Sequence, residues 1–386
     1  MKALVVDADW EPREDYELNE FEKETGKVIE GNSVWRNPDM EVRDVEKPTP
    51  GEGEVLLRVK ACGVCGSDIH FYETDEDNYM LYPGLTKFPI AIGHEFAGEI
   101  VEIGGGPETE EFEVGDRVTT EEMVWCGHCK PCRDGLPNHC KNLEELGITI
   151  DGAMAEYIAV PAKLCWSVDS IFDRFDDEEV AWDVSATTEP TCVAYNSIFE
   201  RGEGFRPGSY VVVYGAGPIG LAAIQLAKSS GASKVIAFEV SPERLELASE
   251  VGADYAFDPQ KVDPTEEVMS ITNGEGADFQ LEAAGAPAQT IPEMESSVAI
   301  NGKMSQVGRA AQRVPMYLET FQVRRAQIYG AQGHSGHGIF PSVIRMAGAG
   351  LVDNSRIITS KFDLEDGVEA VKQASKREDG KVIINP

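Results

Sequence analysis

The sequence of 386 residues contains few basic side chains. It has 34 lysines and arginines against 68 aspartates and glutamates, which gives a formal net charge of −34. Such a chain repels nucleic acids and anionic membranes, so we expect neither as a partner. The acids are spread along the sequence instead of forming a tail. This pattern predicts an acidic surface throughout, which is typical of halophilic proteins because salt screens the mutual repulsion.

Export signals and long apolar segments are also scarce. A short apolar stretch at the start soon meets Asp and Glu, which is not typical of a signal peptide, so we expect a cytoplasmic protein. One uncharged run, Ser209–Ala227, is about long enough to span a bilayer. Three glycines and Pro218 interrupt this run, however, and its pattern changes from strand to helix. We therefore expect it to be buried in an α/β core.

The length and the apolar content indicate two globular domains. Apolar residues make up 42% of the chain, which excludes wholesale disorder. A single hydrophobic core stops growing at roughly 250–300 residues, so a chain of this length is expected to form two domains. No internal repeat or low-complexity tract appears in the sequence.

The pattern of apolar residues changes near residue 205. Before it, short strands are predicted among glycines and prolines, at Glu54–Ala61, Ile92–Ile103 and Tyr157–Val160. After it, strands alternate with helices, as in a doubly wound parallel sheet. The predicted strands are Tyr210–Tyr214, Lys234–Glu239, Phe279–Glu282, Lys303–Val307 and Gln327–Ala331, and the clearest helices are Leu221–Ser229 and Pro242–Val251.

The last fifty residues are expected to return to the first domain. They contain a helix-like segment, Asp363–Ser375, and a final strand, Lys381–Ile384. The predicted domains are therefore residues 1–188 together with 340–386, and residues 189–339 for the α/β domain.

Four of the eight cysteines fall within fifteen residues. In a large chain without an export signal, such dense spacing indicates a metal site instead of disulfides. Four thiolates this close can surround one Zn²⁺ tetrahedrally, which makes the site structural. The cysteines of this predicted zinc lobe (residues 121–142) are Cys126, Cys129, Cys132 and Cys140. His128 and His139 lie in the same lobe, and we expect both to face solvent.

A glycine-rich turn indicates a dinucleotide site. The turn follows an apolar strand and opens a helix, and it reads Gly215-Ala216-Gly217-Pro218-Ile219-Gly220. Its glycines permit a tight turn, close approach of the pyrophosphate and close helix–strand packing, with the helix N-terminus facing the phosphates.

Two residues after this turn bear on the choice of cofactor. Glu239 follows Gly220 by nineteen residues and can accept hydrogen bonds from the adenosine ribose, which favours NAD. Arg244 could instead bind a 2′-phosphate, so NADP stays possible.

A second metal site is predicted from separated segments. Cys62 and Cys65 precede a Gly-Ser-Asp stretch, and His94-Glu95 follows later in the chain. A thiolate, an imidazole and a carboxylate can hold Zn²⁺ with one position left for water or substrate, as in catalytic sites. Glu189, at the passage into the second domain, offers another carboxylate.

In these motifs the chain resembles zinc-containing medium-chain alcohol dehydrogenases of the polyol (sorbitol-like) branch, and the resemblance extends almost from end to end. The resemblance is carried by the four-cysteine lobe and by VKACGVCGSDIH (59–70), GHEFAGEIVEIG (93–104), EPTCVAY (189–195) and VVVYGAGPIGLAAIQLAK (211–228). More specific stretches, such as WCGHCKPC, ELGITIDGAMAEY and VRRAQIYGAQGHSGHG, are similar to bacterial dehydrogenases that act on inositol-derived ketoses.

The resemblance implies an architecture and a ligand set. The expected fold is α/β, with a GroES-like β-rich catalytic domain and a doubly wound Rossmann cofactor domain, assembled as a homodimer or homotetramer. Cys65, and not Cys62, takes the position of the ligand cysteine, and His94 is the second ligand. Either Glu95 or Glu189 is the third, or the two alternate during turnover.

The resemblance also assigns residues to proton transfer and cofactor binding. Ser67 takes the position of a hydroxyl relay, and His70 that of the outer proton acceptor. One of Arg324 and Arg325 is expected to contact the cofactor pyrophosphate, and Arg325 is the candidate carried forward.

Three further segments of the sequence each allow two interpretations. His334 and His337 lie in a glycine-rich segment that lines either a polar substrate pocket or a subunit contact. Glu121-Glu122 is either structural or a second metal site. Two acidic insertions, Asp9–Asp39 and Glu73–Lys87, are either solvated loops or, for the second, a rim of the active-site cleft.

The predicted function is zinc-dependent hydride transfer between NAD(P) and an alcohol, most simply a polyol, cyclitol or other secondary alcohol. The partner is then a small alcohol or its ketone. Two alternatives remain. One is a broad dehydrogenase of primary or aromatic alcohols, with either NAD or NADP as the preferred cofactor. The other is a ligand-binding protein without activity on the same scaffold.

Overall fold

The computed structural model describes residues 1–309 and 312–386, which divide into two compact units. Unit 1 contains Met1–Glu189, Ser360–Lys376 and Val382–Pro386, and unit 2 contains Pro190–Thr359 and Arg377–Lys381. The chain therefore returns to unit 1 at Ser360, later than the expected residue 340. The reason is that Val352 and Ile357 are buried in an apolar cluster of unit 2.

Unit 1 is built mainly from antiparallel sheets. Its largest sheet has the order β10-β6-β5-β3-β18-β17, with β9 also paired to β3, and a smaller one has the order β2-β1-β4. The strands are β1 (Lys2–Trp10), β2 (Trp35–Asp44), β3 (Glu54–Gly63), β4 (Ile90–Ala91), β5 (Glu95–Ile103), β6 (Arg117–Thr120), β7 (Met123–Val124), β8 (Glu144–Glu145), β9 (Tyr157–Pro161), β10 (Cys165–Ser167), β17 (Ile358–Asp363) and β18 (Lys381–Asn385).

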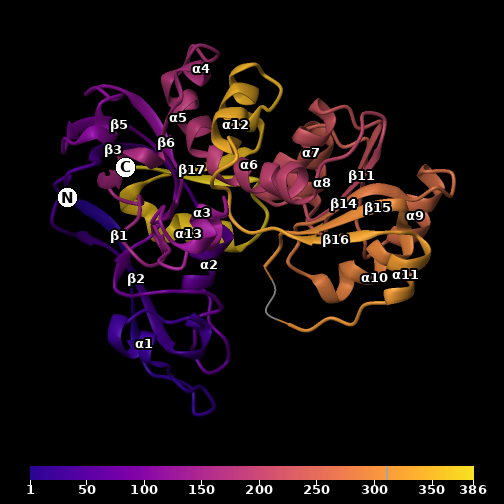
Figure 1. The fold of residues 1–386 in the computed structure, drawn as a ribbon, viewed down its shortest axis with the longest axis horizontal. Helices are drawn as coiled ribbons and strands as arrows, with labels where there is room; N and C mark the ends of the chain where they lie inside the picture. Colours follow the sequence, from indigo (N-terminus) through magenta and orange to yellow (C-terminus); the bar gives the residue numbers. More distant parts are fainter. Residues whose placement is uncertain (310–311) are drawn as a thin grey trace. The chain divides into compact units, whose positions relative to one another are not determined.

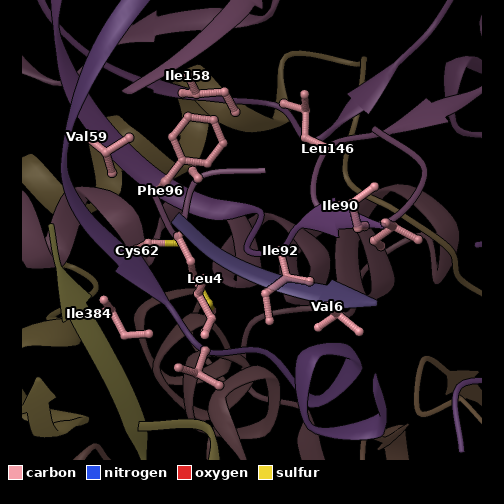
Figure 2. Packing of buried hydrophobic residues seen from close by; sticks show 14 of the residues in the cluster. Leu4, Val6, Val59, Cys62, Ile90, Ile92, Phe96, Leu146, Ile158 and Ile384 are labelled. Atoms are coloured by element: carbon pink, nitrogen blue, oxygen red, sulfur yellow. The ribbon is translucent and has the colours of Figure 1, made fainter. Parts of the chain in front are cut away.

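Short helices connect these strands. They are α1 (Glu20–Thr25), α2 (Gly66–Tyr72), α3 (Lys130–Arg133), α4 (Asp169–Phe172), α5 (Glu178–Ala186) and α13 (Gly367–Ser375), and α6 (Thr188–Tyr195) leads into unit 2. Figure 2 shows the apolar core of unit 1, where Leu4, Cys62 and Phe96 lie together without solvent contact. Strands from distant parts of the sequence meet there, including Ile384 near the C-terminus.

The two acidic insertions of unit 1 do not form separate solvated loops. The backbones of Val28 and Thr86 exchange two hydrogen bonds of 2.8 and 2.9 Å, and the N–H of Met80 donates to the carbonyl of Trp35 at 3.1 Å. The indigo and purple segments accordingly run side by side next to β2 (Figure 1). This pairing could not be predicted from local patterns, because it depends on contacts between segments about fifty residues apart. We call the joined segments, residues 9–39 and 73–87, the insertion module.

Unit 2 contains one parallel sheet with the order β13-β12-β11-β14-β15-β16. This order is that of the doubly wound dinucleotide-binding fold, which confirms the expected class. The strands are β11 (Tyr210–Tyr214), β12 (Lys234–Phe238), β13 (Tyr255–Phe257), β14 (Ala277–Glu282), β15 (Val298–Gln306) and β16 (Gln327–Gly330), and the helices are α7 (Pro218–Ser229), α8 (Pro242–Glu250), α9 (Pro264–Ile271), α10 (Pro287–Ser297), α11 (Leu318–Val323) and α12 (Ile339–Gly348).

Both faces of this sheet are covered by helices. Side chains alternate along a strand, so Val211 and Val213 of β11 pack in one apolar cluster with α7, whereas Val212 and Tyr214 pack in another with α10. Figure 1 shows α7 and α8 on one face and α10 and α11 on the other. The run Ser209–Ala227 is thus a buried strand and helix, as predicted. Among the described residues, no helix combines the length and the apolar character that a membrane crossing needs.

Candidate active site and zinc centres

Three of the predicted metal ligands meet in unit 1. Cys65 caps the N-terminus of α2, His94 precedes β5 and Glu95 begins it. One potential ligand atom from each lies within 4.8 Å of the other two. His94 and Glu95 are almost fully buried, at 4% and 1% exposure. A thiolate, an imidazole and a carboxylate converging in this way form a donor set suited to zinc.

The backbone near this group leaves room for the carboxylate. Gly63 pairs with Glu95 across β3 and β5, and a methyl group on Gly63 would lie 2.3 Å from the Oε2 atom of Glu95. Cys62 points elsewhere, into the apolar core, and its sulfur would lie 2.8 Å from a methyl group on Gly93. The structure therefore brings Cys65 into the group and leaves Cys62 as a buried neighbour.

Asp68 holds this group together, a role that the sequence analysis did not assign. Its carboxylate is fully buried and accepts a hydrogen bond of 2.8 Å from the backbone N–H of Cys65. The other oxygen lies 3.9 Å from the Nδ1 atom of His94. Burial by itself lowers the pKa of His94, but Cys65 and Asp68 raise it more, so its pKa stands well above the usual value. An S/T/C-x-x-D capping pattern at Cys65 was the available signal.

Ser67 and His70 lie on α2 three residues apart, so they share a face of the helix. The Oγ atom of Ser67 is 3.4 Å from the Nε2 atom of His94, beside the candidate metal group. His70 is partly exposed, and its Nδ1 atom lies 3.6 Å from a carboxylate oxygen of Glu73. The helix thus runs from the candidate metal group toward solvent.

Two more buried carboxylates stand near the group. Oxygens of Glu122 and Glu189 lie within 4.8 Å of each other, and both residues are nearly inaccessible to solvent. Glu122 also contributes to the raised pKa of His94, so its charge acts on the same site. Glu121 differs, since its carboxylate accepts hydrogen bonds from the indole N–H groups of Trp125 and Trp166 at 3.4 and 3.1 Å. Glu121 is therefore structural.

The four cysteines of the predicted lobe also converge. Their sulfur atoms all lie within 4.8 Å of one another. The pKa of Cys126 is lowered to about 5, first by a hydrogen bond from the backbone of His128, which favours the thiolate. Backbone N–H groups donate to the sulfurs of Cys129 and Cys140 at 3.3–3.4 Å. Four thiolates leave no open position, so this group fits a structural zinc. His128 and His139 are exposed, as expected.

The glycine-rich turn of unit 2 has the geometry that a dinucleotide needs. Gly215 has a φ of +90°, and a methyl group on Gly220 would lie 1.9 Å from the carbonyl oxygen of Gly215. Beside Gly217 there is open space, with only the guanidinium of Arg244 at 3.7 Å from a Cβ placed there. Pro218 and Ile219 open α7, whose N-terminus faces this space.

Glu239 closes the far side of the turn. One carboxylate oxygen accepts from the N–H of Ala216 at 2.7 Å, and the other from Val240 and Ser241 at 2.7 and 3.0 Å. Arg244 is held nearby, because its Nε atom donates to the carbonyl of Asp379 at 2.9 Å. Both predicted cofactor contacts are therefore anchored at the turn.

Arg325 is placed elsewhere. The strands β11 and β16 run parallel, through β14 and β15. Arg325 comes before β16, whereas the glycine turn follows the end of β11, so Arg325 lies at the amino ends of the parallel strands and the turn at their carboxyl ends. Arg324 binds the carbonyl of Val298 at 2.9 Å. The structure therefore does not bring Arg325 to the glycine turn, and the pyrophosphate contact that the family resemblance implied stays a prediction.

The histidines of the glycine-rich segment differ from each other. His334 is fully buried and packs edge-on against Phe340 at 5.3 Å. His337 is half exposed and lies 4.0 Å from Glu200. The segment is fastened by Asn196, whose side chain donates to the carbonyls of Gln332 and Gly333 at 3.2 and 2.8 Å.

Comparison with known proteins agrees with this geometry. The alcohol dehydrogenase GroES-like domain family matches residues 51–170, and the zinc-binding dehydrogenase family matches residues 218–348. The chain belongs to the zinc-type medium-chain alcohol dehydrogenases. It is therefore an enzyme of the class that moves a hydride between an alcohol and a nicotinamide cofactor, with zinc as its metal.

Individual dehydrogenases of the family cover nearly the whole chain. The scyllo-inosose 3-dehydrogenase of Thermotoga maritima is 46% identical over 97% of this chain and 96% of its own. The L-threonine 3-dehydrogenase of Pyrococcus horikoshii is 36% identical over 89% of this chain and 94% of its own. A solved Thermotoga maritima structure described as an alcohol dehydrogenase superposes with a TM-score of 0.95, at 44% identity and full coverage of both chains.

Proposed function

We propose that this dehydrogenase interconverts a polyol or cyclitol with its ketone, using NAD. The observation that carries the proposal is the buried pair Glu122 and Glu189, close to the candidate zinc ligands. Buried carboxylates can accept hydrogen bonds from the hydroxyl groups of a polyol or cyclitol, whereas an aliphatic or aromatic alcohol offers no further hydroxyl for such a contact. The similarity to an inosose dehydrogenase supports the same substrate class.

Each residue of the candidate active site has a role in the proposed reaction. Zinc held by Cys65, His94 and a carboxylate supplies Lewis acidity, and the bound nicotinamide supplies a hydride acceptor. Asp68 keeps the imidazole of His94 in place. Ser67 lies beside the zinc ligands and takes the hydroxyl proton, and His70 receives it at the outer end of α2. The hydroxyl proton thus reaches solvent through Ser67 and His70, and the nicotinamide, when bound, would accept the hydride.

Glu95 is the better candidate for the third ligand. Its carboxylate belongs to the same group of atoms as Cys65 and His94, while Glu189 groups with Glu122. Glu189 is then left to hold substrate hydroxyls or water.

A substrate panel tests the function. Inositols, inososes, sorbitol and glucose are compared with benzyl alcohol and L-threonine, using zinc-loaded enzyme and both cofactors. We expect kcat/KM for the best cyclitol or polyol to exceed that for benzyl alcohol by at least about a hundredfold, because a site built for hydroxyls rejects analogues that lack them. A preference for benzyl alcohol or L-threonine would contradict the proposal.

Glu239 tests the preference for NAD. In the Glu239→Gln enzyme we expect the ratio of kcat/KM with NAD to that with NADP to fall roughly tenfold, since a charge-assisted hydrogen bond to the ribose is lost. The exposed Glu243→Gln on α8 is the matched control and should keep the ratio. An unchanged ratio in Glu239→Gln would leave the choice of cofactor to other groups.

We also propose that the protein is adapted to high salt in the cytoplasm, and the acidic surface supports this proposal. With a net charge of −34, self-repulsion destabilises the compact state in dilute buffer. The midpoint of thermal unfolding and the activity should therefore both rise as potassium chloride increases into the molar range. An optimum in dilute buffer would contradict this adaptation without affecting the catalytic proposal.

A homodimer or homotetramer is the proposed assembly. Large apolar side chains are exposed around the end of the parallel sheet, among them Ile300, Leu318 and Val323 at 70–76% exposure. A contact between subunits would cover such exposed apolar side chains. Light scattering measures the mass directly, and a monomer at micromolar concentration would exclude the assembly.

A further inference from the structure

The helix that carries the proposed proton path is too short to stabilise itself. α2 has seven residues, and isolated helices of fewer than about twelve are marginal in water. Its first turn is fixed by Asp68, which accepts the hydrogen bond from the N–H of Cys65. Its last turn, with His70, needs contacts from elsewhere in unit 1.

The insertion module provides these contacts. The N–H of Leu81 donates to the carbonyl of His70 at 3.0 Å and to that of Glu73 at 3.1 Å. Phe71, the residue after His70, is fully buried and packs edge-on against the ring of Tyr82 of the module at 4.9 Å and against Phe88, the residue that follows the module, at 5.5 Å. The module therefore binds both the backbone and the buried side of the last turn.

Aromatic contacts and a hydrogen bond join the two segments of the module next to these rings. Trp35, from its first segment, packs edge-on against Phe88 at 5.2 Å and donates its indole N–H to the hydroxyl of Thr86 at 3.0 Å. At the outer end, the guanidinium of Arg13 lies 3.8 Å over the ring of Tyr79. Both segments are thus needed to hold the aromatic contacts with α2.

We propose that the insertion module is a positioning element that fixes the last turn of α2 and thereby the place of His70 on the proton path. The proposal rests on the proposed function only for the role of His70. The contact between the module and α2 does not depend on it. Tyr82 and Leu81 act through Phe71 and His70, so they are positioning residues and not catalytic ones. The acidic insertions accordingly serve the reaction as well as the surface charge.

Replacing the ring of Tyr82 tests the proposal. In Tyr82→Leu the edge-on contact with Phe71 is lost, and we expect kcat to fall about ten- to a hundredfold, because small displacements of reacting groups are costly. The KM for NAD should stay within about twofold. The solvent deuterium isotope effect on kcat should increase, because proton transfer becomes slower relative to hydride transfer. Tyr82→Phe keeps the ring and should restore kcat and the isotope effect.

Hydrogen–deuterium exchange gives a readout that does not require activity. The amides of α2 should exchange at least about tenfold faster in Tyr82→Leu, whereas the four-cysteine lobe stays protected. Arg13→Ala loosens the outer end of the module and should give the same change in smaller degree. Arg43→Ala removes an exposed ion pair outside the module and is the matched control.

The outcomes separate this proposal from the proposed function. Unchanged exchange in α2, or a fall in kcat without a change in the isotope effect, would overturn the positioning role. A wild-type enzyme that oxidises no alcohol would overturn the proposed function. Faster exchange in Tyr82→Leu would still show that the insertion module holds the last turn of α2.

Discussion

The Cys65→Ser enzyme is expected to lose at least about a thousandfold in kcat/KM while keeping its fold. Cys65 is the one thiolate in the group with His94 and Glu95, and a serine hydroxyl is a poor ligand for zinc. A thousandfold loss corresponds to about 4 kcal/mol of transition-state stabilisation, which is within the range that a metal ion supplies. Kinetics with the best polyol and the zinc content of the purified variant give the measurement.

The unfolding temperature separates this effect from misfolding. Cys65 is partly exposed at the start of α2, and its backbone N–H, which Asp68 binds, is unchanged in the variant. The Tm should therefore shift by no more than about 1 °C, and the zinc of the four-cysteine lobe should remain. A Cys65→Ser protein that retains full activity would show that the catalytic metal is held elsewhere.

The Cys129→Ser enzyme is expected to show the reverse pattern, with stability lost first. Cys129 contributes one of four mutually close sulfurs in a lobe that has little other structure than α3 and the β7–β8 pair. Structural zinc supplies folding free energy directly, so losing it should cost about 3 kcal/mol or more. For a chain of 386 residues that corresponds to a fall in Tm of roughly 4 °C or more.

A histidine in the same lobe provides the control. His139 is exposed, and His139→Ala should leave both the Tm and the zinc content unchanged. Thermal unfolding with and without a chelator completes the test. Equal Tm values for Cys129→Ser and the wild type would contradict a structural zinc.

The sequence alone predicted those parts of the site that depend on local spacing. The glycine turn from Gly215 to Gly220 carries its own φ requirements and close approaches, so its conformation follows from the residue types. The four cysteines are near neighbours in sequence, and their convergence in the structure needs no distant contact. The fold class followed for the same reason, since alternating strands and helices in unit 2 can form few topologies.

Contacts between distant segments could not be predicted in this way. The insertion module depends on the pairing of Val28 with Thr86, and both segments look like acidic loops in the sequence. The resemblance that suggested Arg325 as a cofactor contact did not show that this residue precedes the amino end of β16, away from the glycine turn after the carboxyl end of β11. Asp68 was overlooked since its importance comes from burial beside His94, which composition does not reveal.

Zinc-edge anomalous diffraction from crystals of the purified enzyme tests the central claim most directly. The account predicts two peaks per chain, one within bonding distance of Cys65, His94 and Glu95, and one among Cys126, Cys129, Cys132 and Cys140. Bonding distances are about 2.3 Å to sulfur and about 2.0–2.2 Å to nitrogen and oxygen. A peak in the four-cysteine lobe, with none near Cys65 in zinc-loaded and active enzyme, would contradict the account.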